Sequence, residues 1–190
     1  MILTIRTVGE PLLRERSRTL TREEILSPQI QDLIDSMRET MHHAPGVGLA
    51  APQIGESLQL AVIEDRKAYH KDIPAEQLAA RERKPVPFHV IVNPILTLES
   101  QPEVEFFEGC LSLPGFMAVV RRARKVRVEC LNHKGQARII HASGWYARIL
   151  QHEIDHLMGT VYIDRMRSQT FSTIENYDRH WKGKPVQPQV

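Results

Sequence analysis

The sequence has 190 residues, of which 42% are hydrophobic and 25% are charged, and this is typical of a globular protein with one domain. The formal net charge of +2 is too small to indicate a nucleic-acid partner. No apolar run approaches the roughly 20 residues that a membrane-spanning helix needs, so no membrane partner is expected. The first residues lack the long apolar core of a secretory signal, and an intracellular protein is therefore expected.

The first half of the chain is expected to contain one long helix and one strand. Residues Pro28–His43 carry apolar side chains at helical spacing. The glycine-rich stretch Gly46–Gly55 predicts a loop that is pressed closely against another element. Leu58–Ile63 predicts a strand. Glu64–Pro87 predicts an exposed loop segment with a short helical turn at Ala75–Arg83.

The second half of the chain is expected to form strands followed by a helix. Alternating apolar residues predict strands at Phe88–Val92, Ile95–Leu98, Val104–Phe107, Ala118–Val120, Val126–Leu131 and Arg138–His141. A helix is expected from Ser143 to about Met158, ended by Gly159, with a last short strand at Val161–Ile163. Several strands followed by a helix indicate an α+β fold, with mainly antiparallel sheets around this central helix.

The second helix carries the strongest chemical signal, the sequence His152-Glu153-Ile154-Asp155-His156. Two histidines four positions apart lie one turn apart on the same helix face, so both imidazoles can reach one metal ion. Glu153 can approach a water at that metal without binding the metal itself, as a general base must. The alternative is an ordinary helix that contains the pattern by chance, but its apolar neighbours place it in the core, where unpartnered histidines are costly.

A catalytic metal held by two histidines needs a third protein ligand, and Cys110 is the best candidate. It follows a predicted strand, it lies in a segment with glycines that allow close backbone approach, and its thiolate would be a strong ligand for a soft or borderline ion. A buried structural cysteine is the alternative. The other cysteine, Cys130, lies in an alternating strand pattern and is expected to be buried without chemistry.

Three segments together resemble the signature motifs of the peptide deformylase family. These are the loop G-x-G-L-A-A-x-Q, here Gly46–Gln53, the segment E-G-C-L-S, here Glu108–Ser112, and the helix Q-H-E-x-D-H, here Gln151–His156. Their order and spacing also match, and three motifs in order are far more specific than one. The resemblance implies a catalytic domain over residues 1–166 and leaves residues 167–190 as a C-terminal tail. The residues just before this motif, Ser143–Arg148, resemble those of the subgroup that includes mitochondrial and plastid members.

Matched position by position, the resemblance implies a role for each catalytic group. The implied metal ligands are Cys110, His152 and His156. Glu153 would take a proton from the water activated at the metal and later deliver it to the leaving amine. The side-chain amide of Gln53 and the backbone N–H of Leu111 would face the developing oxyanion. Arg122 would pair with Glu108 and stiffen the cysteine segment.

The resemblance also implies how the substrate is held. The backbones of Gly48 and Gly109 would contact the peptide, which would lie as an added strand. Because formylation marks the initiator residue, the first side chain would be methionine and its pocket apolar. Trp145 and Ile149 share the helix face of the first histidine, and Val47 could close the other side. For Trp145, a plain core position is an equal alternative.

The resemblance therefore implies an enzyme that removes formate from the N-terminal formyl-methionine of newly made polypeptides. It implies one Fe²⁺ ion per chain, with Zn²⁺, Ni²⁺ or Co²⁺ as alternatives that these ligands accept. The implied partners are N-formyl-methionyl nascent peptides, in a bacterial cytoplasm or, if a transit peptide was removed, in an organelle. Two other functions are weighed against this one: another metalloamidase or peptidase, and a binding module with a structural metal.

The basic run Arg121–Arg127 is a further feature with two interpretations. It alternates into a predicted strand, and this favours a solvated face over a direct nucleic-acid contact. A transient contact with the ribosome is the remaining alternative for this run.

Overall fold

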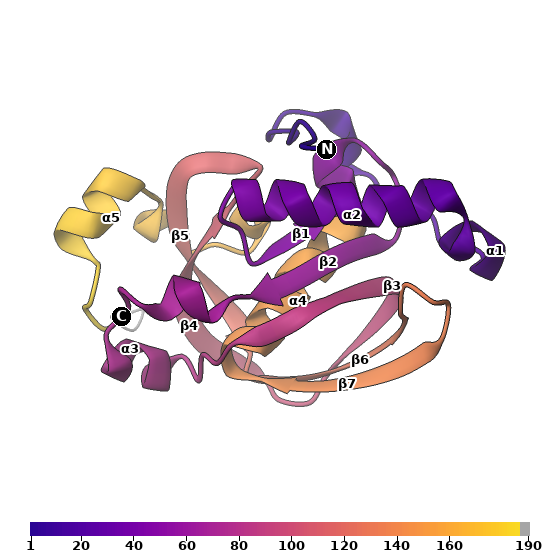
Figure 1. The fold of residues 1–190 in the computed structure, drawn as a ribbon. Helices are drawn as coiled ribbons and strands as arrows, with labels where there is room; N and C mark the ends of the chain where they lie inside the picture. The colour runs from indigo at the N-terminus through magenta and orange to yellow at the C-terminus, as the bar shows by residue number, and fades with distance from the viewer. Residues whose placement is uncertain (187–190) are drawn as a thin grey trace.

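The computed structural model describes residues 1–186, which form two sheets packed around a central helix, α4 (Figure 1). One sheet has the strand order β1-β2-β3-β6-β7 and the other has the order β4-β5-β8, and every pairing between these strands is antiparallel. The strands are β1 Gly48–Ala50, β2 Leu60–Asp65, β3 Val86–Leu98, β4 Pro102–Cys110, β5 Leu113–Ala123, β6 Lys125–Leu131, β7 Ala137–Ser143 and β8 Ser172–Thr173. The predicted α+β class is confirmed.

Five α-helices and five shorter 3₁₀ turns connect the strands of the described chain. The helices are α1 Arg22–Leu26, α2 Pro28–His43, α3 Ala75–Ala80, α4 Gly144–Leu157 and α5 Ile174–His180. The 3₁₀ turns are η1 Pro11–Arg14, η2 Ala51–Ile54, η3 Lys67–His70, η4 Tyr162–Asp164 and η5 Ser168–Thr170. Within residues 1–186, no helix combines the length and the apolar character that crossing a bilayer requires.

Strand β2 shows why the five-stranded sheet has a helix on each face. Leu60 and Val62 belong to the core cluster that includes α2, whereas Ala61 and Ile63 belong to the cluster that includes α4. Because successive strand residues point to opposite faces, the almost continuous apolar run of β2 is buried on both sides. Burial of each large side chain contributes about 1.5–3 kcal/mol, so both helices are held firmly.

Polar side chains hold α4 against the second sheet. The Gln151 side chain accepts a hydrogen bond from Ala123 N at 3.0 Å and donates one to Ala123 O at 2.9 Å. Arg148 also donates to Val120 O, at 3.0 Å. These bonds satisfy buried backbone groups of β5. The helix that carries residues 152–156 is therefore fixed between the two sheets.

Two expectations about residues 46–98 are wrong in detail. The stretch Gly46–Gly55 is not all loop, because Gly48–Ala50 pairs with β2 as strand β1. The two strands expected between Phe88 and Leu98 are one strand, β3, with an irregular register around Asn93. Asn93 has a φ of 51°, and its side-chain oxygen accepts a hydrogen bond from Leu20 N. Asparagine tolerates this backbone conformation, so the chain bends without ending the strand.

The strand expected at Val161–Ile163 is also wrong, because residues Tyr162–Asp164 form a 3₁₀ turn. The carboxylate of Asp164 accepts a hydrogen bond from Val161 N at 2.9 Å. This backbone N–H is therefore not available to pair with an adjacent strand. Tyr162 is fully buried. The apolar pattern of Val161–Ile163 therefore predicts that this segment is buried, but it does not predict its backbone conformation.

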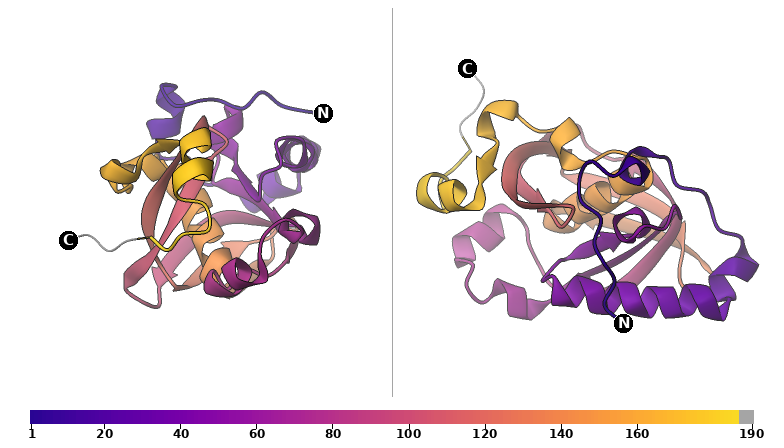
Figure 2. Two further views of the ribbon diagram at one scale, coloured as in Figure 1. Left: turned by 90° about the vertical axis from the view of Figure 1, so that its left-hand side faces the viewer. Right: turned by 90° about the horizontal axis from the view of Figure 1, so that it is seen from above.

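The segment predicted as a C-terminal tail contains structure up to residue 186. Thr173 and Ser172 pair with the edge of β5, and α5 places Tyr177 and Trp181 against the Phe107 ring at centroid distances of 4.9 and 5.5 Å. Helices α3 and α5 lie at the same end of the molecule (Figures 1 and 2). The last four residues of the predicted tail lie outside the described part of the chain.

Candidate metal centre and pocket

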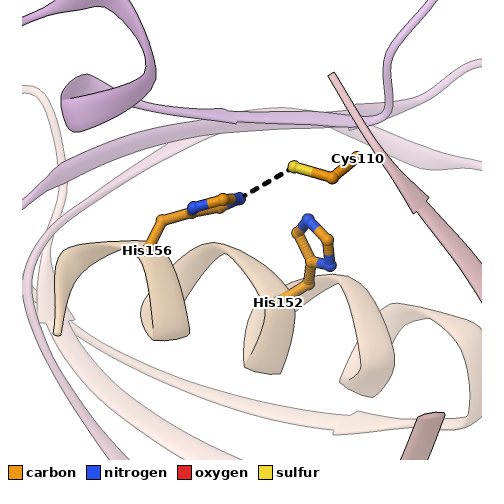
Figure 3. A group of neighbouring side chains, drawn as sticks. All are labelled: Cys110, His152 and His156. Carbon is orange, nitrogen blue, oxygen red and sulfur yellow. Dashed lines mark hydrogen bonds between the residues drawn. The ribbon is translucent and has the colours of Figure 1, made fainter. Parts of the chain in front are cut away.

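Three ligand atoms converge beneath the end of strand β4. Cys110 is the last residue of β4, whereas His152 and His156 stand one turn apart on α4 and point toward its sulfur (Figure 3). The Cys110 Sγ lies 3.2 Å from His156 Nε2, and one ligand atom from each residue lies within 4.8 Å of the others. A thiolate and two imidazoles at these separations can hold one metal ion, and they leave a coordination position open.

The surroundings of Cys110 favour its ligand form. Burial alone would raise the pKa of the thiol, but the adjacent His156 and His152 hold that pKa well below its ordinary value. For His152, burial works against the charged imidazole, yet the hydrogen bonds to Cys110 and Glu108 raise its pKa well above the ordinary value. The pair therefore favours a thiolate, which is the form of cysteine that binds metals.

Glu108 orients the first histidine. The Nδ1–H of His152 donates to Glu108 Oε2 at 3.0 Å, and this bond leaves the Nε2 atom of the same ring available for a metal. Glu108 also accepts two hydrogen bonds from Arg122, both at 2.9 Å, and one from Arg148 at 2.6 Å. Burial would raise the pKa of this carboxyl, but the Arg122 guanidinium and the bond from His152 hold it well below the usual range.

The ion-pair network continues from Glu108 to Asp155. Arg122 donates to Asp155 Oδ2 at 2.5 Å, and Arg165 binds the same carboxylate at 2.7 and 2.8 Å. Arg122 and Glu108 each have side chains only 4% exposed, so the charges are paired where water cannot screen them. The pairing of Arg122 with Glu108 was expected from the sequence and is confirmed.

Glu153 points to the side of the helix where strand β1 passes. An alanine Cβ at Gly48 would lie 2.2 Å from Glu153 Oε1, so only a glycine lets the two elements approach this closely. The side chain is buried, and its Oε2 atom has no hydrogen-bond partner among the described residues. Burial raises the pKa of Glu153, although His152 and His156 oppose this effect. A buried, unpartnered carboxylate oxygen beside three metal-binding atoms fits a site that holds a metal and a water.

Gln53 brings an amide donor to the same place from turn η2. Its oxygen accepts a hydrogen bond from Ala50 N at 2.9 Å, which fixes the orientation of the amide. The Nε2 atom then faces Cys110 Sγ at 3.6 Å and Ser112 Oγ at 3.2 Å. A neutral donor is thereby held beside the metal-binding atoms.

A pocket of about 670 Å³ opens above these groups. It is lined by ten residues that the sequence singled out as site residues, namely Val47, Gly48, Gln53, Gly109, Cys110, Leu111, Trp145, Ile149, His152 and Glu153. Its surface is mainly apolar, and Cys110 and His152 are part of its lining, whereas the third candidate ligand, His156, is buried next to Cys110 and does not line it. This size and lining suit a small or extended organic ligand with one apolar side chain.

The sequence model of the polypeptide deformylase family matches residues 2–172. The chain belongs to the polypeptide deformylase family. Peptide deformylase 1A of tomato (Solanum lycopersicum), a chloroplastic protein, is 49% identical over 170 residues, which are 90% of this chain and 61% of the relative. The chloroplastic/mitochondrial peptide deformylase 1A of Arabidopsis thaliana is 48% identical over 170 residues, 90% of this chain and 63% of the relative. This chain thus spans about three fifths of the length of these plant proteins.

Solved deformylase structures share the fold. The crystal structure of a class I type b peptide deformylase from Acinetobacter baumannii with bound Met-Ala-Ser matches with a TM-score of 0.77 at 30% identity. The match covers 87% of this chain and 99% of that chain. The chain therefore shares its fold with this deformylase over most of its length.

Several deformylase pocket residues were not expected from the sequence. Arg81, Arg83 and Phe107 line one wall, and Ile174 and Tyr177 line it from α5. The last two residues lie beyond the part matched by the family model. Trp145 lines the pocket and also packs against the core cluster around α4.

The basic run 121–127 is largely neutralised by ion pairs. Its ion pairs are Arg121–Glu105, Arg122–Glu108, Arg124–Glu82 and Arg127–Glu129. The run therefore presents little uncompensated positive charge, which favours its interpretation as a solvated face.

Proposed function

We propose that this protein removes the formyl group from the N-terminal formyl-methionine of newly made polypeptides. The observation that carries the proposal is the convergence of Cys110, His152 and His156 next to an apolar pocket that Cys110, His152 and Glu153 line. Membership of the polypeptide deformylase family supports the same reaction.

The proposed metal ligands are Cys110, His152 and His156, with Fe²⁺ as the ion and Zn²⁺, Ni²⁺ or Co²⁺ as substitutes. The donor set fits these ions, because thiolate and imidazole suit soft or borderline divalent metals. When bound, such an ion acts as a Lewis acid and lowers the pKa of water.

Glu153 is proposed to move the proton. Its carboxylate accepts a proton from the attacking water as the oxygen bonds to the formyl carbon. It then donates that proton to the departing amine nitrogen as the carbon–nitrogen bond breaks, which releases formate. The raised pKa of this buried group suits both steps, since the same carboxyl must gain and lose a proton near neutral pH.

Gln53 and Leu111 are proposed to stabilise the negative charge that develops on the formyl oxygen. The Gln53 amide is already fixed by Ala50 N, so its N–H donor needs no reorganisation during the reaction. The backbone N–H of Leu111 would supply the second donor from the residue that follows the cysteine ligand.

The pocket is proposed to hold the first residue of the peptide. Val47, Trp145 and Ile149 line it and would enclose the methionine side chain, while the backbones of Gly48 and Gly109 would contact the peptide. The Acinetobacter baumannii relative was solved with bound Met-Ala-Ser, and this supports a methionyl peptide as the ligand here. Both compartments named above, a bacterial cytoplasm and an organelle, start polypeptides with formyl-methionine, so the proposed activity is the same in either.

Formate release tests the proposed function directly. Protein purified anaerobically and loaded with Fe²⁺ should release formate from formyl-Met-Ala-Ser and should release no amino acid from Met-Ala-Ser. Loading separate samples with Zn²⁺, Ni²⁺ or Co²⁺ shows which metal supports the fastest formate release. Hydrolysis of the unblocked peptide without formate release would instead identify a peptidase.

Replacing Gly48 with alanine is expected to lower kcat about 10- to 100-fold with the metal still bound. The new methyl group would lie 2.2 Å from Glu153 Oε1 and 2.8 Å from Glu153 Cγ, so the carboxylate must leave its position. Steady-state kinetics and metal analysis measure the two parts of this result.

Gly46→Ala is the matched control, two residues earlier in the same segment. Its methyl group would meet Leu111 Cδ1 at 2.9 Å, the movable end of a flexible side chain. We expect less than about a threefold change in kcat for this variant, because that side chain can turn away. Equal losses in both variants would show that the effect is general disruption of the segment and not displacement of Glu153.

A further inference from the structure

Arg81 is a cation of the pocket wall without an ion-pair partner within residues 1–186. It is partly exposed and contacts the faces of Trp145 and Phe106, with its guanidinium carbon 5.0 and 5.7 Å from the ring centroids. The other arginines of the wall are compensated: Arg83 binds Asp65 and Arg148 binds Glu108. The positive charge of Arg81 is therefore the one that remains available to a ligand in this pocket.

The local backbone holds Arg81 in this position. The next residue, Glu82, has a φ of 48°. This left-handed backbone conformation costs a residue other than glycine about 1–3 kcal/mol of conformational free energy. An alanine Cβ at Gly144 would lie 2.9 Å from the carbonyl oxygen of Arg81, so the turn is packed directly on the first residue of α4. Ion pairs on both sides of the turn hold it there, Glu82 with Arg124 and Arg83 with Asp65.

Arg81 also lies close enough to another cation for the two to repel. The positive charge of Arg81 acts against that of Arg148, which is itself buried behind Trp145. An anionic ligand group at Arg81 would relieve this repulsion and would form a charge-assisted hydrogen bond at the same time. A planar carboxylate matches the fork of a guanidinium.

We propose that Arg81 binds a carboxylate of the substrate peptide beyond its first residue, and that the enzyme therefore prefers nascent peptides with an acidic side chain at the second or third position. This inference rests on the proposed function, because it names the peptides that the same pocket selects. A short peptide can present the same carboxylate from its C-terminus, so the test must separate the two sources.

The test compares kcat/KM for two series of amidated peptides, formyl-Met-Xaa-Ser and formyl-Met-Ala-Xaa, with Xaa as Glu, Gln or Lys. For the wild type we expect Glu to exceed its neutral isostere Gln by about three- to tenfold in one series, with Lys below Gln. The Arg81→Ala variant should bring the Glu/Gln ratio to about one, and Arg81→Glu should reverse the order of Glu and Lys. A purely structural role of Arg81 on the Trp145 ring would leave all of these ratios unchanged.

Lys71→Ala is the matched control, because Lys71 is an exposed positive charge in the same segment, Glu64–Pro87, and does not line the pocket. It should keep the wild-type ratio. A ratio of one in the wild-type protein, or a ratio that survives in Arg81→Ala, would overturn the inference. Free-acid peptides form the last arm: a free-acid preference that disappears in Arg81→Ala, with an amidated Glu/Gln ratio of one, would assign carboxylate recognition to the chain end and overturn the preference for acidic side chains. Failure to release formate from any peptide would overturn the proposed function itself, which is a separate result.

Discussion

Replacing Glu153 with glutamine is expected to lower kcat about 10²- to 10⁴-fold while the metal stays bound. Glutamine has the same shape but cannot take the proton from water or return it to the amine. The metal should stay because the three converging ligand atoms belong to Cys110, His152 and His156 and not to Glu153. Formate-release kinetics and elemental analysis of the same preparation measure both quantities.

The stability of this variant provides a second, independent readout. In the metal-free protein, burial raises the pKa of Glu153, so the folded state holds this carboxylate at a cost in stability that a neutral amide does not incur. We expect the Tm of metal-free Glu153→Gln to equal or exceed that of the metal-free wild type, as is common where a residue serves activity at the expense of stability. Glu64→Gln is the matched control, since Glu64 is a largely buried carboxylate that pairs with His42 away from the pocket, and its kcat should not change. Retained activity in Glu153→Gln would remove this residue from the mechanism.

Replacing Glu108 with glutamine is expected to lower the free energy of unfolding by about 3–5 kcal/mol and to weaken metal binding about 10- to 100-fold. The substitution leaves two arginines, Arg122 and Arg148, without their shared anion, although both side chains are only 4% exposed. It also removes the charge that fixes the Nδ1–H of His152. Chemical denaturation and competition with a chelator measure the two losses.

The pH dependence of this stability loss has a defined sign. The Arg122 guanidinium and His152 outweigh burial and hold the native pKa of Glu108 well below its unfolded value of about 4.3. The contribution of Glu108 is therefore complete above the unfolded pKa and falls as the pH drops toward the native pKa. The difference in unfolding free energy between wild type and Glu108→Gln should stay constant from neutral pH down to about 4.3 and should narrow as the pH falls further.

Glu105→Gln is the control for this prediction, three residues earlier on the same strand. Glu105 binds Arg121, which is 54% exposed, and Arg167, which is 16% exposed, so only part of its pairing is shielded from water. Because the exposed pair contributes little, we expect a clearly smaller loss of stability than in Glu108→Gln, and an unchanged metal affinity. Equal losses in both variants would contradict a special role for the buried network.

The parts of the site that the sequence predicts are those set by local geometry. Helical periodicity alone places His152 and His156 on one face, and it keeps Glu153 off that face. Cys110 was expected as the third ligand from its glycine-containing segment after a strand, and the resemblance implied the same role. Gln53 was expected from the resemblance alone, since no spacing rule brings residues 53, 110 and 152 together. The fold class followed from the succession of strands and the helix after them.

The parts that the sequence did not predict depend on contacts between distant segments. Arg81 reaches the pocket only because its turn packs on Gly144, and Tyr177 does so only because α5 packs on Phe107. Neither contact leaves a periodic signal in the chain. The charged residues Arg148 and Asp155 within an apolar helix were a signal that could have been used, because charges in a buried helix need partners.

The close approach of β1 and α4 limits how Glu153 can act. The backbone at Gly48 leaves no space beside the Glu153 side chain from Cγ to Oε1. The carboxylate therefore cannot move toward β1. In the proposed mechanism, proton capture and proton delivery take place on the side of Glu153 that faces away from Gly48, so the reaction depends on how firmly the peptide is seated on that side.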